Sequence, residues 1–373
     1  MSGNGGVERF ETVVIGGGQA GLSTGYYLQK RGLPFVILDA NERVGDSWRK
    51  RWDSMRLFTP AKFDGLAGMP FPGRHFRAPS KDEMGDYLES YAARFDMPVR
   101  NGVKVERLSR EGGRFVVQTK RGRLEAEQVV VATGAFQIPK VPGFARDLDP
   151  AIVQLHSVDY RNSSQLREGG VLVVGVGNSG ADISIEVARS HETWLAGKES
   201  GHIPVRIDSF AGRLLIPLVR FMGHHVLKWT TPMGRKVMPK LKAKATPLIR
   251  VKPKDIVRAG VQRVPRVAGV KDGLPLLEDG RVLDVANVIW CTGFRQDFSW
   301  IDLPILDEDG EPKHRRGIVA DEPGLFFVGL FFQYSVTSDV ITGVSRDAEY
   351  VAKHIAARRA STAAKAQVES VGK

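Results

Sequence analysis

The sequence is nearly without cysteine. Cys291 is the only one in 373 residues, which excludes an internal disulfide and a C-x-x-C dithiol pair. It lies in the apolar run VIWCTGF, where we expect a small, buried side chain in a strand. The chemistry of a dithiol redox enzyme is therefore not open to this chain.

Long apolar runs are also missing. No stretch approaches the roughly 18 apolar residues of a membrane span, and the N-terminal MSGNGGVERF lacks the apolar core of a signal peptide. We therefore expect a cytoplasmic protein whose glycine-rich residues 1–8 are disordered. A length of 373 residues with 42% hydrophobic content suggests two or three domains.

Acidic residues are scarce in one segment. From His202 to Arg266, fifteen Lys or Arg stand against Asp208 and Asp255, so this basic segment carries the net charge of +12. It is expected to line a substrate entrance, to contact an anionic membrane surface, or to form a solvated lid. Sparse aromatic residues and the lack of a recognised motif argue against nucleic-acid binding.

The stretch TVVIGGGQAGLSTGYY carries the spacing G-x-G-x-x-G at Gly16, Gly18 and Gly21, after an apolar run and before a helical pattern. The first glycine permits a tight turn, and the second lets a pyrophosphate approach the backbone. The third lets the helix pack on the strand, with the helix amides facing the phosphates. This stretch predicts a dinucleotide-binding unit.

The same spacing recurs 159 residues later, at Gly175, Gly177 and Gly180, although the 41 glycines predict roughly 0.5 such spacings by chance. The Thr-Gly pairs of VVVATGAF and VIWCTGFR share this offset, which indicates two copies of one unit.

The two units differ in charge. Asp39 ends the second strand of the first unit, where a carboxylate accepts from an adenosine ribose and repels a 2′-phosphate, so that unit is expected to bind FAD or NAD. At the same offset the second unit has Lys198, which is either a partner for the 2′-phosphate of NADP(H) or a solvated surface lysine.

The pattern along the chain predicts an α/β fold with two Rossmann-like units of the three-layer ββα type, the second inserted in the first. We expect the domain for FAD or NAD at 1–160, the NADP-binding domain at 161–295 with the basic insertion at 200–265, and a return to the first domain at 296–373.

Local signals predict the individual elements. They indicate a strand at 10–15, a helix to about 29, a strand at 35–38, and a helix beginning at the capping box of Ser80 and Glu83. Antiparallel strands follow at 103–108, 114–119 and 123–131, and then a linker at 138–170. In the basic segment, Pro217 is expected to break a helical pattern, and Ser338 is expected to cap the last helix.

These motifs resemble the class B flavin-dependent monooxygenases, which include flavin-containing monooxygenases, Baeyer-Villiger enzymes and the plant auxin-forming enzymes. The resemblance covers nearly the whole chain and rests on GGGQAGL with VGDSW, on LFTP, on the Thr-Gly pairs and on VGVGNSGADI. In PAIVQLHSVDY, His156 and Tyr160 match the family fingerprint F-x-G-x-x-x-H-x-x-x-[W/Y], whereas Pro150 and Ile152 replace its Phe and Gly.

The resemblance implies that NADPH reduces FAD and that O2 adds to the reduced ring as a C4a-hydroperoxide. This intermediate oxygenates a small organic substrate at nitrogen, sulfur or carbon, and retained NADP⁺ shields it from water. Two alternatives stay open. One is a flavoprotein reductase or oxidase without oxygen insertion, and the other is a nucleotide-binding sensor that contacts a membrane.

The resemblance also implies roles for single residues. His156 and Tyr160 are the candidate catalytic residues, although His156 also fits a structural histidine, and no metal site is expected. The loop that holds Trp48 either wraps a flat aromatic ring or plugs the domain with its tryptophans. The candidate cofactor-binding residues are Gly16, Gly18, Gln19, Ala20, Gly21, Asp39, Ala40, Gly45, Asp46, Ser47, Trp48, Leu57, Phe58, Thr59, Val105, Ala132, Thr133, Gly134, Gly175, Gly177, Asn178, Ser179, Gly180, Lys198, Thr292, Gly293, Gly329 and Ser338.

Overall fold

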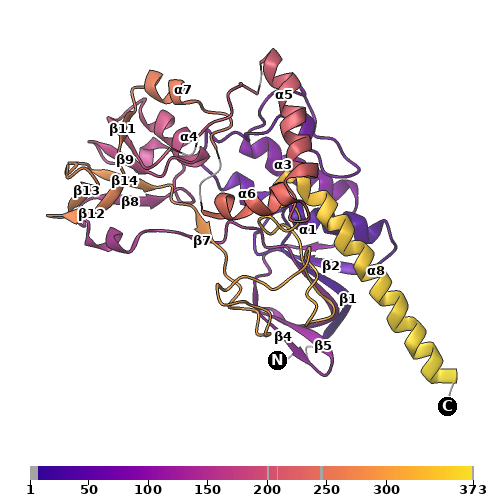
Figure 1. Cartoon of the computed structure of the whole chain (residues 1–373). Coiled ribbons are helices and arrows are strands. Elements are labelled where there is room, and N and C mark those ends of the chain that lie inside the picture. Colours follow the sequence, from indigo (N-terminus) through magenta and orange to yellow (C-terminus); the bar gives the residue numbers. More distant parts are fainter. Residues whose placement is uncertain (1–6, 200, 208, 244–246, 372–373) are drawn as a thin grey trace.

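The chain forms two α/β lobes in a computed structural model that describes residues 7–199, 201–207, 209–243 and 247–371 (Figure 1). In the first lobe the strand order is β3-β2-β1-β6-β5-β4, and β16 pairs with β6. Its strands are β1 (Glu8–Ile15), β2 (Phe35–Leu38), β3 (Val99–Arg100), β4 (Val105–Glu111), β5 (Arg114–Thr119), β6 (Gly122–Val131) and β16 (Leu325–Phe327).

The alternation of side chains in β1 divides the core of this lobe into two layers. Val14 packs under α1 (Gln19–Gln29), α3 (Lys81–Arg94) and α8 (Ile341–Val371) on one face of the sheet. Val13 and Ile15 pack on the other face, against the inner side of the antiparallel strands β4 to β6. This arrangement confirms the three-layer ββα prediction.

The second lobe is built on a parallel sheet of order β11-β10-β9-β14-β8. Helices α4 (Asn178–Val187) and α7 (Pro253–Arg258) contribute to the core on one face. A hairpin of β12 (Val267–Lys271) and β13 (Leu274–Leu277) contributes to the core on the other. The strands of the sheet are β8 (Val153–His156), β9 (Val171–Val174), β10 (Thr193–Ala196), β11 (Gln262–Val264) and β14 (Asn287–Trp290).

Two short strands mark where the chain passes between the lobes. Strand β7 (Ile138–Pro139), on the way out, pairs antiparallel with β15 (Phe294–Arg295), on the way back. The second lobe is therefore inserted in the first, as predicted. The division at residue 160 stays a prediction, and the pairing of β8 with β14 places residues 153–156 in the second sheet.

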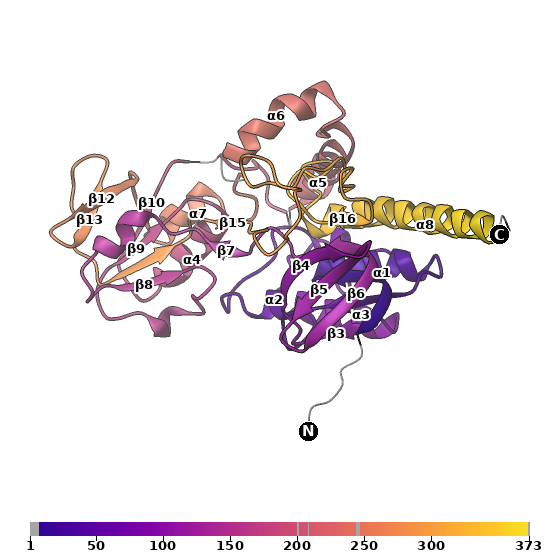
Figure 2. The ribbon, with the colours of Figure 1, turned by 90° about the horizontal axis from the view of Figure 1, so that it is seen from below.

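The first part of the basic segment packs beside the first lobe, whereas its end, with α7 and β11, belongs to the second lobe. The first part forms α5 (Phe210–Phe221), the π-helix η4 (Met222–Val226) and α6 (Pro232–Ala243), and Figure 2 shows these helices next to the start of α8. The prediction that Pro217 breaks the helix was wrong, because α5 runs through it. The cap that Ser209 provides to Gly212 N (3.0 Å), together with packing, outweighs the one backbone hydrogen bond that a proline cannot donate.

Most local predictions are confirmed, including the helix at α1 and the capping box at Ser80. Three differ. Glu8 belongs to β1, whereas residues 1–6 lie outside the described part. Strand β8 was missed in the linker. Ser338 does not cap α8, because its Oγ accepts from Tyr334 N and Ser335 N (3.0 Å each).

The remaining short elements are α2 (Asp46–Arg49), η1 (Ala61–Phe63), η2 (Gly143–Asp147) and η3 (Ser163–Gln165). None of the helices formed by the described residues combines the length and apolar content that a membrane crossing needs.

Candidate active site and cofactor sites

The first glycine turn is shaped by two close backbone approaches. Gly16 has φ +111°, and a Cβ there would lie 2.4 Å from the carbonyl oxygen of Ala132. A Cβ on Gly21 would lie 1.8 Å from the carbonyl oxygen of Gly16, so strand and helix touch at this point. At Gly18 a Cβ would meet nothing within 4 Å. The second glycine thus faces open space at the amide end of α1, which fits a diphosphate.

Asp39 lies beside this turn with its carboxylate already oriented. Gly17 N donates to its Oδ2 (2.7 Å), and Asn41 donates to its Oδ1 through the backbone N (2.7 Å) and the side-chain Nδ2 (3.0 Å). These bonds hold a buried negative charge at the end of β2. The carboxylate suits ribose hydroxyls and opposes a 2′-phosphate, so the residues present fit the adenosine part of FAD.

The second turn repeats the first. Gly175 has φ +112°, and a Cβ there would lie 2.3 Å from the carbonyl oxygen of Cys291. A Cβ on Gly180 would lie 1.8 Å from the carbonyl oxygen of Gly175. The dihedral angles also agree, with −83° and −175° at Gly177 against −79° and −167° at Gly18. The sequence repeat is therefore a repeat of backbone geometry.

The strand register corrects the pairing of Asp39 with Lys198. Strand β1 pairs Ile15 with Leu38, whereas β9 pairs Val174 with Ala196. The residue after Ala196 is Gly197, so the position of Asp39 is taken by a glycine, and the exposed Lys198 lies one residue further on.

Val176 stands where the first unit has Gly17, and a Cβ on Gly197 would lie 3.0 Å from its Cγ2. An aliphatic side chain thus occupies the place where the first unit has its carboxylate. The second unit thus has no carboxylate at the position of Asp39, although Glu199 lines the same pocket as Arg263.

Sequence reasoning missed a cation at this strand end. Arg263, on β11, donates to the carbonyl oxygens of Leu195 (3.0 Å) and Gly197 (2.9 Å). Burial lowers the pKa of this arginine, while Glu199 raises it. A pocket next to the turn is lined by Val176, His202, Arg263 and their neighbours. The offset of 159 residues between the two units could not reveal Arg263, because only the pairing of β10 with β11 brings this residue to the end of β10.

On the flavin side, Gln19 joins three elements. Trp48 donates from Nε1 to Gln19 Oε1 (3.3 Å), and Gln19 Nε2 donates to the carbonyl oxygen of Asp339 (3.5 Å), just before α8. The starts of α1 and α8 therefore meet at the indole of Trp48. Gly329 has φ +89° and packs closely against the start of α1, since a Cβ on this glycine would lie 3.0 Å from Cβ of Ala20.

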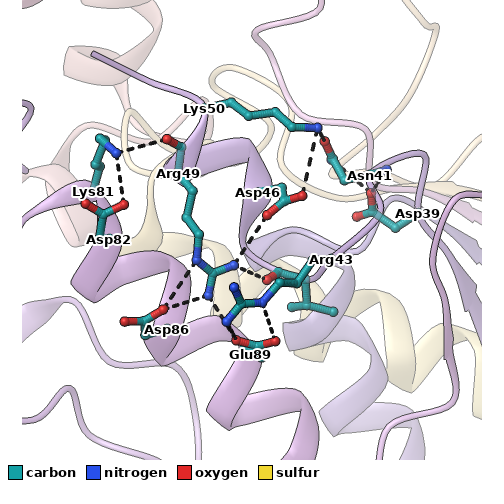
Figure 3. A network of polar contacts seen from close by, with 11 residues as sticks. Asp39, Asn41, Arg43, Asp46, Arg49, Lys50, Lys81, Asp82, Asp86 and Glu89 are labelled. Atoms are coloured by element: carbon teal, nitrogen blue, oxygen red, sulfur yellow. Dashed lines mark hydrogen bonds and ion pairs between the residues drawn. The ribbon is translucent and has the colours of Figure 1, made fainter. Parts of the chain in front are cut away.

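The segment that carries Trp48 is anchored to α3 by a network around Arg49 (Figure 3). Its guanidinium donates to the carbonyl oxygen of Val44 (2.7 Å) and contacts Asp86 (2.8 Å) and Glu89 (3.0 Å). Its side chain is only 15% exposed, whereas that of Arg43, which also pairs with Glu89, is 55% exposed. Arg49 is thus the less exposed of the two arginines and the one that ties α2 to α3.

The loop of LFTP encloses a buried acid. Leu57 is buried, and Thr59 Oγ1 donates to Asp64 Oδ1 (2.5 Å). Asp64 has no exposed surface, and its Oδ2 has no hydrogen-bond partner. Burial raises the pKa of Asp64 to about 7, although the bond from Thr59 opposes the shift.

His156 and Tyr160 both have structural partners. His156 Nε2 donates to the carbonyl oxygen of Gly293 (3.1 Å), and its Nδ1 accepts from Val158 N (3.3 Å). Burial lowers the pKa of His156, although the Gly293 bond opposes this, so the ring is neutral. The buried Tyr160 hydroxyl donates to Glu186 Oε1 (2.9 Å). A catalytic role for either residue stays a prediction.

The two Thr-Gly loops are joined through the β7–β15 pair, which brings Phe136 and Phe294 together at a centroid distance of 5.4 Å. The guanidinium of Arg51 lies 5.6 and 5.5 Å from these two ring centroids. Burial lowers the pKa of Arg51, and no ion pair joins it to a carboxylate within the described residues. This partly buried cation was not among the predicted site residues.

The other predicted residues fall around these features. Gly45, Asp46 and Ser47 lie at α2, and Asn178 and Ser179 begin α4. Val105, which begins β4, packs against the core cluster that contains Ile15 and Leu38. No group of His, Cys, Asp or Glu in the described ranges is arranged to hold a metal ion.

The chain is similar to proteins of known class. Residues 13–200 match the family model described as pyridine nucleotide-disulphide oxidoreductase. An uncharacterized CzcO-like oxidoreductase of Geobacillus kaustophilus is 39% identical over 348 residues, which are 92% of this chain and 98% of that protein. The probable indole-3-pyruvate monooxygenase YUCCA3 of Arabidopsis thaliana is 31% identical over 93% of this chain and 86% of its own.

Among solved structures, a flavin-containing monooxygenase of Stenotrophomonas maltophilia superposes with a TM-score of 0.76 at 28% identity. The match covers 94% of this chain and 99% of that one.

Proposed function

The chain belongs to the pyridine nucleotide-disulphide oxidoreductase family and is a flavin monooxygenase, and we propose that it uses NADPH, FAD and O2 to oxygenate a small organic substrate at nitrogen, sulfur or a carbonyl carbon. The likeness to a flavin-containing monooxygenase, together with the two glycine turns, supports FAD and NADP as its cofactors. With Cys291 alone, the chain lacks the dithiol pair of disulphide reductases, which supports oxygenation over disulphide exchange.

One observation carries the proposal most directly. The two glycine turns share their backbone geometry, yet one faces the carboxylate of Asp39 and the other faces Gly197 and Arg263. A shared fold with opposite charge suits two different adenine dinucleotides, one without and one with a 2′-phosphate. This is the arrangement that an NADPH-dependent flavoprotein requires.

For the first unit, we assign FAD to the turn at Gly18, to Asp39 and to the meeting point of Gln19 and Trp48. The amides of α1 face the diphosphate, and Asp39 accepts from the ribose. The start of α8 places the positive end of a helix dipole near Asp339, where it stabilises negative charge on a reduced ring.

For the second unit, we assign the diphosphate of NADP to the turn at Gly177 and the start of α4. Lys198 and Arg263 are assigned to the 2′-phosphate, because both lie at the strand end where the first unit has its acid. The junction at Arg51 and His156 would then hold the nicotinamide end.

The bound cofactors supply hydride transfer and oxygen activation. The residues of the chain supply position. Neutral His156 donates its Nε2 proton to the Gly293 carbonyl and so holds the second Thr-Gly loop. Phe136 and Phe294 form an edge-to-face pair at the junction, and Phe136 is 61% exposed there, so it offers an apolar surface beside the two Thr-Gly loops.

The substrate is proposed only as a class. The related plant protein is named for indole-3-pyruvate, and an aromatic 2-oxo acid is therefore one of the candidates to test here. The sequence alternatives of a reductase, an oxidase or a sensor differ from this proposal in that they insert no oxygen atom. A cytoplasmic location and contact of the segment 202–266 with an anionic membrane also remain predictions.

The test is to purify the protein with FAD and to measure NADPH oxidation in ¹⁸O2 with amines, sulfides, ketones and aromatic 2-oxo acids. The proposal expects one class to yield a product carrying a single ¹⁸O atom, with little hydrogen peroxide. NADPH oxidation that yields only hydrogen peroxide, with every class, would favour an oxidase.

A further inference from the structure

Helix α5 exposes an apolar stripe. Phe210, Leu214, Leu218 and Phe221 are 77, 67, 54 and 54% exposed, although the rest of the lobe buries most of its large apolar side chains. Their spacing of four, four and three residues places them on one side of the helix. Figure 1 shows α5 along the outer margin of the molecule. An exposed row of apolar side chains of this kind marks a surface that binds another protein or a membrane.

Cations lie along one flank of the stripe. The guanidinium groups of Arg213 and Arg220 lie 5.5 Å from the Phe76 ring centroid and 5.3 Å from that of Phe63, and Lys62 Nζ lies within 5.8 Å of both. No ion pair joins these three cations to a carboxylate in the described parts of the chain. The three positive charges around these two rings therefore make a surface that would attract an anionic partner.

The surrounding sequence supplies no such counterpart. From Ser209 to Lys254 the chain has no Asp or Glu and eleven Lys or Arg. A second copy of this chain would bring like charges together, which disfavours self-association through this face. An anionic bilayer offers both an apolar interior for the stripe and phosphate groups for the flanking cations.

We propose that α5 is an interfacial helix that binds the protein peripherally to an anionic lipid bilayer. Phe210, Leu214, Leu218 and Phe221 enter the boundary of the acyl chains, and Arg213, Arg220 and Lys62 lie at the level of the phosphates. The proposal does not depend on which substrate the enzyme oxygenates, because it concerns a surface outside both cofactor sites.

The experiment is flotation of the FAD-loaded protein with vesicles of phosphatidylcholine alone or with about 30% phosphatidylglycerol. Binding is expected only with phosphatidylglycerol, and it should weaken in about 0.5 M salt. The double variants Leu214→Ser/Leu218→Ser and Arg213→Gln/Arg220→Gln should each lower the partition coefficient by at least about tenfold.

Two matched controls keep the test specific. Val257→Ser removes an apolar side chain that is 71% exposed on α7, and Arg94→Gln removes a cation over the ring of Phe95 on α3. Neither should change binding by more than about twofold. Flavin content and the midpoint of thermal unfolding, unchanged in the variants, establish that they fold.

Three results would overturn the proposal. Equal binding to both vesicle types is one. Binding that survives the two serine substitutions is another, because the stripe would then stay outside the bilayer. The third is a dimer in light scattering that the serine substitutions dissociate, with no vesicle binding, since the occupant would then be a second copy.

Discussion

The guanidinium of Arg263 donates to the carbonyl oxygen of Gly197 across 2.9 Å, at the strand end where the first unit has Asp39. If this guanidinium binds the 2′-phosphate of NADPH, Arg263→Ala should raise KM for NADPH by about 10- to 100-fold and change KM for NADH little. Lys198→Ala should act in the same direction. Steady-state kinetics with both nucleotides check this, with the exposed Arg266→Ala as the control. Equal increases for NADPH and NADH would remove Arg263 and Lys198 from the phosphate site.

The same substitution should have opposite effects at two glycines of the first turn. Gly18→Ala adds a methyl group in open space at φ −79°, so the FAD-free protein should be as stable as wild type or gain about 0.4–1 kcal/mol. FAD affinity should fall, because the methyl group meets the diphosphate.

Gly21→Ala should instead lower the free energy of unfolding by about 3 kcal/mol or more, since the new Cβ lies 1.8 Å from the Gly16 carbonyl oxygen. Urea unfolding of the FAD-free forms and titration with FAD measure the two effects separately. A Gly18→Ala protein that binds FAD normally would show that the diphosphate does not approach this glycine.

Arg49 and Arg43 share Glu89 as a partner but differ in burial. Arg49→Ala should lower the free energy of unfolding by about 1–2 kcal/mol, because it leaves the Val44 carbonyl without its partly buried donor. Arg43→Ala should change the free energy of unfolding less, because its side chain is exposed and water screens its pair with Glu89. The ratio of bound FAD to protein should fall only for Arg49→Ala, which releases the segment that carries Trp48. Similar losses in the two variants would show that Arg49 has no special anchoring role.

Asp64 should make stability depend on pH. Burial raises its pKa in the folded chain to about 7, while its ordinary value is 3.8. Between these values the unfolded chain binds fewer protons at this residue than the folded chain does. The free energy of unfolding therefore falls as the pH rises from about 4 to about 7 and levels off above that range.

Asp64→Asn should remove this decline in the free energy of unfolding, which amounts to at most roughly 4 kcal/mol at neutral pH. Urea unfolding of the FAD-free protein at about pH 5 and about pH 7.5 compares the slopes, with the exposed Asp321→Asn as the control. The variant keeps an acceptor for the Thr59 hydroxyl. A variant that follows the wild-type curve would mean that Asp64 is already ionised in the folded protein.

Features of the site that depend on neighbouring residues could be predicted from the sequence. In each glycine turn, the contact of the third glycine with the first follows from backbone constraints within six residues, and the capping box at Ser80 is equally local. Features that depend on strand register could not. The offset of 159 residues assumes that the connections in both units have equal lengths. The strand register shows that Gly197, rather than Lys198, is the equivalent of Asp39 in the second unit.

Distant pairing was also invisible to the sequence. Arg263 reaches its position through the pairing of β11 with β10, and Arg51 comes between Phe136 and Phe294 because the Thr-Gly loops meet. The low helix propensity of proline led to the wrong prediction at Pro217, because the rest of α5 compensates for the one backbone hydrogen bond that this residue cannot donate.

The place of β16 and α8 in the chain has a consequence for how the protein is made. β16 pairs with β6, and α8 packs on α1, yet both are encoded after the whole inserted lobe. When the ribosome has delivered residue 300, the second lobe has all its strands, while the first lobe still lacks β16 and one helical wall. The flavin site proposed for the first lobe is therefore complete only when translation is almost finished, and a nascent chain truncated before α8 would leave apolar surface of the sheet for chaperones to shield.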